Sequence, residues 1–269
     1  MSADVKQGAH VALNYELAWP FRRSHMSGGI RALSALRDEL LQRGYDAWLT
    51  GDVIPVPVDR ARYERRMAEP RIGIYPEAVP DNRQNFDNVV RWKLNRADDL
   101  PDDGLTYAWL EDMGDHPLLR VNIYELDLWK PYTGPRSGVA YWVGKGKLDK
   151  SVLPDGCEEI GKHNYTTREA LAERLKTLDH LISFDPLTAM TQEAAICGTP
   201  SLIVNADEFW TREKLETNVT MSPGIAWSPE ELDHARSTVG EAYDHYQALL
   251  PRFAQQIDDF VETTQTTFG

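Results

Sequence analysis

Short apolar runs alternate with longer amphipathic segments along most of this chain. The apolar runs predict strands at residues 10–15, 47–50, 71–75, 105–110, 120–124, 139–143, 180–184 and 200–205. Leucine and isoleucine recur at helical spacing over residues 30–44, where Gly44 is a favourable stop. Further helices are expected at residues 85–95, 166–178, 188–197 and 229–264. Thr166, with Glu169 three positions later, would cap the second of these, and Pro251 would break or kink the last.

The order of these elements indicates an α/β protein with two consecutive halves. Each half begins with a strand that runs into a glycine-containing loop, and helices then alternate with strands. Between the halves, residues 130–138 hold two glycines and two prolines, a composition that favours a hinge. We expect doubly wound domains at residues 1–133 and 134–228, with C-terminal helices at 229–269 packing across both.

Composition and charge narrow the classes of function. The 269 residues are 42% hydrophobic and include 42 acidic against 29 basic side chains, a formal net charge of −13. This charge argues against nonspecific binding to nucleic acid or anionic membranes, although it leaves room for a local basic groove. No apolar run approaches the about 20 residues of a membrane span, and the polar N-terminus has no signal core, so we expect a cytoplasmic protein. Cys157 and Cys197 suggest neither a disulfide framework nor a zinc site.

The stretch at residues 181–204 joins the predicted architecture to a candidate site. It indicates a buried strand, a loop opened by Asp185, a helix that carries Glu193, a stop at Gly198 and a second buried strand. In open α/β sheets, ligands bind outside the carboxyl ends of the strands. The two acidic residues are therefore expected at the ligand-binding edge.

A glycine loop opens each half. Gly144, Lys145 and Gly146 follow a predicted strand, where glycines admit the close approach of a diphosphate and lysine supplies a positive charge, although many ordinary turns share this pattern. Gly28 and Gly29 precede the first predicted helix, where they either receive a phosphate or sugar or form a plain turn. No complete G-x-G-x-x-G is present, so NAD binding loses its main support.

These segments resemble the GT-B glycosyltransferases of bacterial and phage polysaccharide type. The letters YWVGKG at residues 141–146 are similar to the start of the donor domain in family 4-like members, and DPLTAMTQEAAICGTP at 185–200 resembles their E-x7-E signature. Asp185 and Glu193 stand eight apart in the two acidic positions, with aspartate in place of the first glutamate. The first half, with IYPE at 74–77 and NVVRWKLNR at 88–96, is similar more loosely.

The resemblance implies two Rossmann-like domains facing across a cleft, a nucleotide-diphosphate sugar as co-substrate, retention at the anomeric carbon, and no bound metal or other cofactor. The second half would hold the donor and the first half the acceptor. Asp185 would accept hydrogen bonds from sugar hydroxyls, cap the helix that follows, or do both. Thr188 and Ala189 would offer backbone N–H groups to the diphosphate. Glu193 would take ribose hydroxyls, unless it is an ordinary exposed helix glutamate.

Four further residues are weaker candidates. His25 lies three residues before Gly28, and Glu77 ends a predicted strand. Both are candidate catalytic residues facing the cleft, although a loop histidine is more often simply solvated. Trp129 and Tyr132, beside the hinge, would stack a base or pack in the core.

Other charged residues are expected to be structural. Arg91 and Lys93 are placed on a helix surface, and the E-x-x-H at Glu231 and His234 lacks a second ligand pair and is interpreted as a solvated helix face.

The patterns and the resemblance together predict a glycosyltransferase of hexosyl or related groups. A nucleotide-sugar epimerase of similar fold and a non-catalytic binding protein remain alternatives. The acceptor would be a glycan, a protein or a modified DNA base, and the acidic charge makes DNA the less favoured of these.

Overall fold

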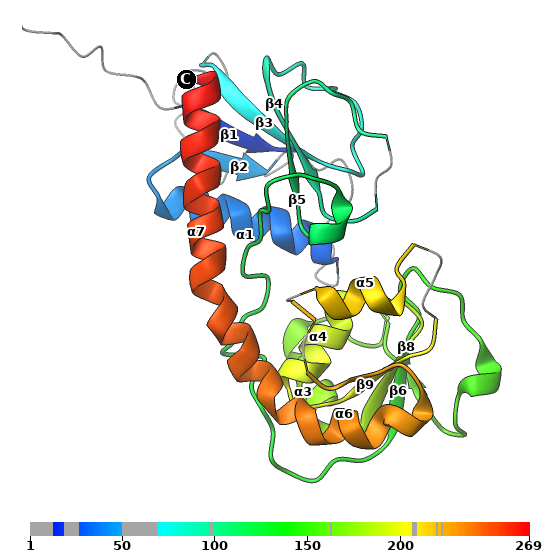
Figure 1. Cartoon of the computed structure of the whole chain (residues 1–269). Coiled ribbons are helices and arrows are strands. Elements are labelled where there is room, and N and C mark those ends of the chain that lie inside the picture. The colour runs from blue at the N-terminus through cyan, green and yellow to red at the C-terminus, as the bar shows by residue number, and fades with distance from the viewer. Residues whose placement is uncertain are drawn as a thin grey trace, which may run out of the picture. The chain divides into compact units, whose positions relative to one another are not determined.

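The structure of the chain is a computed structural model, which describes residues 13–18, 27–49, 69–96, 99–161, 163–205, 209–218, 220–221 and 223–269. It divides into two compact units (Figure 1). The first unit includes Gly29–Val121 and Phe253–Gly269, and the second includes Asn122–Arg252. The main chain passes from one to the other after Val121, ahead of the hinge expected at residues 130–138.

The first unit is built on a parallel five-stranded sheet in the order β2-β1-β3-β4-β5. The strands are β1 (Asn14–Leu17), β2 (Ala47–Leu49), β3 (Arg71–Pro76), β4 (Asn88–Lys93) and β5 (Leu105–Ala108). Helix α1 (Gly28–Gln42) buries Leu33, Leu36 and Leu40, which recur at helical spacing. It ends before Gly44, whose φ of +86° is the left-handed conformation that glycine adopts readily.

The second unit repeats this plan with a parallel sheet in the order β10-β9-β8-β6-β7. Its strands are β6 (Val139–Trp142), β7 (Glu158–Glu159), β8 (His180–Ser183), β9 (Ser201–Ile203) and β10 (Ile225–Ala226). Its α-helices are α3 (Arg168–Thr177), α4 (Ala189–Ile196), α5 (Arg212–Thr217) and α6 (Leu232–Thr238). Short 3₁₀ helices lie at Glu111–Met113, Lys150–Val152, Pro229–Glu231 and Val239–Glu241. The predicted α/β class with parallel sheets is confirmed.

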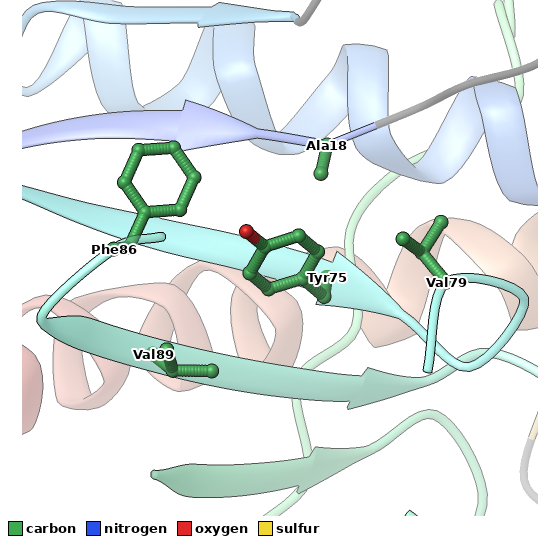
Figure 2. Close-up of a cluster of buried hydrophobic side chains, with 5 residues drawn as sticks. All are labelled: Ala18, Tyr75, Val79, Phe86 and Val89. Carbon is green, nitrogen blue, oxygen red and sulfur yellow. The ribbon is translucent and has the colours of Figure 1, made fainter. Parts of the chain in front are cut away.

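A cluster of buried side chains fixes the turn between β3 and β4 (Figure 2). Its members are Ala18, Tyr75, Val79, Phe86 and Val89. The ring of Phe86 lies over Gly73, where a Cβ atom would come within 1.9 Å of the ring. Glycine at this strand position therefore makes room for the aromatic ring.

Helix α7 (Ala242–Phe268) contributes to both units. Its C-terminal part joins the first core: Phe260 contacts the rings of Tyr15 and Tyr107, and the Tyr15 hydroxyl lies 2.8 Å from the hydroxyl of Thr264. A break or a kink was expected at Pro251, and the break is wrong, because the helix continues through this residue. Proline cannot donate a main-chain hydrogen bond, and contacts such as that of Phe260 with Tyr107 stabilise the helix beyond it.

The helix predicted at residues 85–95 is wrong, because this segment forms strand β4. Val89 to Trp92 are buried on both faces, as in the interior of a parallel sheet. Arg91, expected on a helix surface, is fully buried, and its guanidinium pairs with Asp103 at 2.5 Å and lies over the ring of Tyr75. The charge of Arg91 made the sequence of this buried strand resemble that of an amphipathic helix.

The strand predicted at residues 120–124 is also absent from the assigned strands. Leu118 forms a single bridge with Ala108, and the Arg120 main-chain N–H is donated to Gln256 of α7 rather than to a neighbouring strand. The apolar residues of this segment belong to a buried loop, in which Val121 is fully buried.

Candidate functional site

Two loops meet at the carboxyl ends of neighbouring strands in the second unit. Strands β6 and β8 pair in parallel, with Trp142 opposite Ser183, so the segments that follow them leave the sheet side by side. The first holds Gly144, Lys145 and Gly146, and the second holds Asp185. The structure thus brings together four residues predicted for the site from segments about forty positions apart in the chain.

The glycines allow the two loops to touch. Gly144 has a φ of +56°, and a Cβ atom on it would lie 2.3 Å from a carboxylate oxygen of Asp185. A Cβ on Gly146 would lie 1.7 Å from the carbonyl oxygen of Phe184. At this approach, the main-chain N–H of Lys145 donates a 3.0 Å hydrogen bond to Asp185 Oδ2. Both glycines are therefore needed for the contact between loops.

Asp185 is buried and held in place by its neighbours. Ser183 Oγ donates to the carbonyl of Asp185 at 2.8 Å, and the Asp185 N–H lies 3.3 Å from the same hydroxyl. The alternative in which Asp185 caps the next helix is wrong, since the N-cap of α4 is Thr188, whose hydroxyl accepts the N–H of Met190. The Asp185 carboxylate instead accepts from the glycine loop.

The surroundings of these loops supply positive charge and backbone N–H groups. Lys145 and Lys147 are exposed, and Asn205, just after β9, donates to the carbonyl of Lys147 at 3.0 Å. Thr188 and Ala189 form the half-exposed start of α4, where backbone N–H groups and the helix dipole favour an anion. The carboxyl edge of β6, β8 and β9 is thus suited to a ligand that carries phosphate.

Glu193 lies on α4 and is almost fully buried, so its interpretation as an ordinary exposed glutamate is wrong. Its carboxylate pairs with Arg168 at 3.2 Å, and Arg168 is the first residue of α3. The helix cap is Thr167 and not Thr166, as its hydroxyl accepts the N–H of Ala170. Arg168 was missed from the sequence, although a carboxylate in an apolar helix signals that a basic partner must exist.

The remaining candidates are Gly28, Gly29, Glu77 and His25. Gly28 and Gly29 are the first two residues of α1. Gly28 belongs to the second unit, where a Cβ atom on it would lie 3.7 Å from the Cβ of Ala189. Glu77 follows β3, where its carboxylate accepts the N–H of Leu94 at 3.0 Å and its own N–H is donated to the carbonyl of Trp92. It therefore ties together the ends of β3 and β4. His25 falls outside the described residues.

Trp129, Tyr132 and Cys197 make structural contacts. Trp129 is fully buried, which favours core packing over base stacking, and its ring lies under Arg168. Tyr132 is half-buried, with its N–H donated to the carbonyl of Cys197 and its ring under Arg136. Burial raises the pKa of the Cys197 thiol to about 12, so this group is not a nucleophile near neutral pH.

In the described residues, no group of three or more His, Cys, Asp or Glu side chains is arranged to hold a metal ion. Glu231 accepts the N–H of Trp227 and pairs with Arg212. No helix in the same residues has the length and apolarity needed to cross a membrane.

Comparison with known proteins gives likenesses in structure only. No protein-family model and no curated protein sequence matches the chain. Among solved structures, it is similar to the glycosyltransferase SnogD from Streptomyces nogalater, with 13% identity, a TM-score of 0.43, and coverage of 96% of this chain and 99% of that one. It is also similar to the calicheamicin glycosyltransferase CalG4, with 12% identity, a TM-score of 0.48, and coverage of 96% and 100%. An α-glucosyltransferase solved with UDP and a 13-mer DNA containing an HMU base is 13% identical, with a TM-score of 0.48 and coverage of 95% and 96%.

Proposed function

We propose that this protein is a glycosyltransferase that transfers a sugar from a nucleotide-diphosphate donor to an acceptor. One observation carries the proposal: the Lys145 N–H contacts the Asp185 carboxylate across two glycines that admit no side chain. This contact places an exposed lysine, a fixed carboxylate and the start of α4 at one edge of a parallel sheet. Nucleotide ligands bind at such edges in α/β proteins.

The diphosphate would lie against the glycine loop and the first turn of α4. Negative charge develops on the diphosphate as the bond to the sugar breaks, and preorganised donors lower the free energy of that state. The ammonium of Lys145 and the backbone N–H groups of Thr188 and Ala189 supply these donors. We propose that they act without a metal ion.

The sugar and the ribose would each meet one carboxylate. Asp185 would accept hydrogen bonds from donor-sugar hydroxyls, reaching one methylene less far than the glutamate of the family pattern. Glu193 would accept the two ribose hydroxyls. Retention at the anomeric carbon follows from the resemblance to family 4 and is proposed on that ground.

The first unit would present the acceptor, and the two units would form the GT-B arrangement with residues 229–269 spanning both. In this proposal, Gly28, Gly29, His25 and Glu77 face the acceptor or the transferred group. The acceptor is a glycan, a protein or a modified nucleobase.

A screen of nucleotide sugars tests the proposal. The protein is incubated with UDP-, GDP-, ADP- and TDP-sugars, and release of the nucleoside diphosphate is measured, first with water and then with candidate acceptors. We expect slow hydrolysis of one donor class, which Asp185→Asn abolishes and Asp155→Asn, an exposed loop change in the same unit, leaves intact. No release from any donor, with any acceptor, would count against the proposal.

A further inference from the structure

We propose that Arg168 is a positioning residue, which fixes the carboxylate of Glu193 so that it reads the ribose hydroxyls of the donor nucleotide. The inference rests on the proposed function in assigning the ribose to Glu193. It adds a residue that is absent from the acidic signature and lies 25 positions before Glu193 in the chain.

The position of Arg168 in the fold places it near the ligand edge. It is the first residue of α3, and α3 leads into the amino end of β8. The helix therefore starts at the carboxyl edge of the parallel sheet, which is also where Asp185 lies. Thr167 fixes this start by capping the helix.

The guanidinium of Arg168 is held from several sides. Nη1 lies 3.2 Å from Glu193 Oε1, and Nε lies 3.1 Å from Glu125 Oε1. Its central carbon lies 5.0 Å from the ring centroid of Trp129, which is fully buried. The planar group thus stacks on an aromatic face while its edge meets two carboxylates. A lysine cannot make this combination of contacts.

Because the ion pair is buried, the orientation of the Glu193 carboxylate depends on Arg168. The side chain of Glu193 is 2% exposed and that of Arg168 is 12% exposed, whereas Glu125 is 63% exposed. Removal of the guanidinium takes a charged partner away from this buried carboxylate, which then loses its fixed orientation. The exposed Glu125 only steadies the arginine from outside.

A simple structural role for the pair makes a different prediction. If Arg168 only fastens α3 to α4, its loss weakens binding of every nucleotide by the same factor. If it orients Glu193, its loss weakens only the binding that depends on the ribose hydroxyls. Nucleotides that lack the 2′-hydroxyl separate the two roles.

The experiment compares UDP with dUDP, ADP with dADP and GDP with dGDP by calorimetry, and uses the pair that binds most tightly. We expect the wild type to prefer the ribonucleotide by about tenfold, the effect of one good hydrogen bond. Arg168→Lys and Arg168→Gln should bring this ratio close to one, while the affinity for the deoxynucleotide of that pair changes less than twofold. Glu169→Gln, an exposed change one position later on α3, should keep the wild-type ratio, and thermal unfolding checks that each variant is folded.

A double change makes the test more specific. In a Glu193→Gln background, Arg168→Lys should no longer alter the ratio, because the group it orients has lost its charge. Binding of any nucleoside diphosphate to the wild type supports the proposed function independently of Arg168. Equal weakening of both nucleotides in the Arg168 variants, or an unchanged ratio, would overturn the positioning role while leaving the proposed function in place. Absence of all nucleotide binding would overturn both.

Discussion

The main-chain N–H of Lys145 donates a 3.0 Å hydrogen bond to the carboxylate of Asp185, which lies forty residues later in the chain. The contact joins the loops after two paired parallel strands, β6 and β8. It exists because glycine occupies both positions beside Lys145, where side chains would collide with Phe184 and Asp185. A backbone donor thus sets the orientation of a buried carboxylate and leaves the lysine ammonium exposed.

Replacing Gly146 tests the need for this close approach. A Cβ atom there would lie 1.7 Å from the Phe184 carbonyl oxygen, so Gly146→Ala must push the loop off β8. We expect a loss of about 1–3 kcal/mol in the free energy of unfolding, as for an overpacked core, and a large loss of nucleotide affinity. Urea unfolding and calorimetry measure the two effects. Gly240→Ala, with open space around its Cα, is the matched control and should change neither.

Glu193→Ala tests the proposed ribose contact. Loss of a charged hydrogen bond should weaken nucleoside diphosphate binding by about 1–3 kcal/mol. The matched control is Glu169→Ala, an exposed change on the neighbouring helix α3. Unchanged affinity in a folded Glu193→Ala protein would remove this residue from the site.

The ion pair between Arg91 and Asp103 should make stability depend on pH. The hydrogen bond from Arg91 lowers the pKa of the Asp103 carboxyl below its ordinary value. Because the folded-state pKa lies below the unfolded one, this stabilisation is present at neutral pH and is lost as the pH falls below about 4. Asp103→Asn should therefore lower the free energy of unfolding at pH 7. At pH 3, the free energies of unfolding of the variant and the wild type should differ by less.

Urea unfolding at both pH values measures the effect, with Asp102→Asn, an exposed neighbour, as control. A constant difference between Asp103→Asn and wild type across this range would rule out the proposed origin of the pH dependence.

The two cysteines should differ sharply in reactivity. Cys197 is buried with a pKa raised to about 12, whereas Cys157 is half-buried. Alkylation of the native protein at pH 8 should modify Cys157 alone, and alkylation in urea should modify both. Mass spectrometry of the digested protein identifies the alkylated cysteines. Rapid modification of Cys197 in the native protein would show that the end of α4 opens readily.

Much of the fold was predictable because its strands and helices carry regular patterns. The leucine spacing of α1 and the apolar runs of β3, β6 and β8 each correspond to the element that formed. Strand β4 was missed because Arg91 interrupts its apolar run, and the Asp103 partner that permits its burial lies twelve positions away. Such a pair is visible only once the sheet has formed.

The candidate site was predictable to a similar degree. Gly144, Lys145, Gly146 and Asp185 follow two predicted strands of one half, and parallel pairing of those strands brings the residues into contact. Arg168 was not predictable in this way, because its contact with Glu193 depends on how α3 packs beside α4. A helix–helix contact of this kind leaves no fixed spacing in the sequence.

The most direct test of the donor site is a calorimetric titration of the protein with UDP, GDP, ADP and TDP. We expect at least one nucleoside diphosphate to bind, and Lys145→Ala to weaken its binding about tenfold or more through loss of a charge-assisted contact. The same titration of Lys150→Ala, an exposed lysine outside the glycine loop, should match the wild type. Absence of heat for every nucleotide at millimolar concentration, or equal affinity in the Lys145 and Lys150 variants, would contradict the proposed donor site.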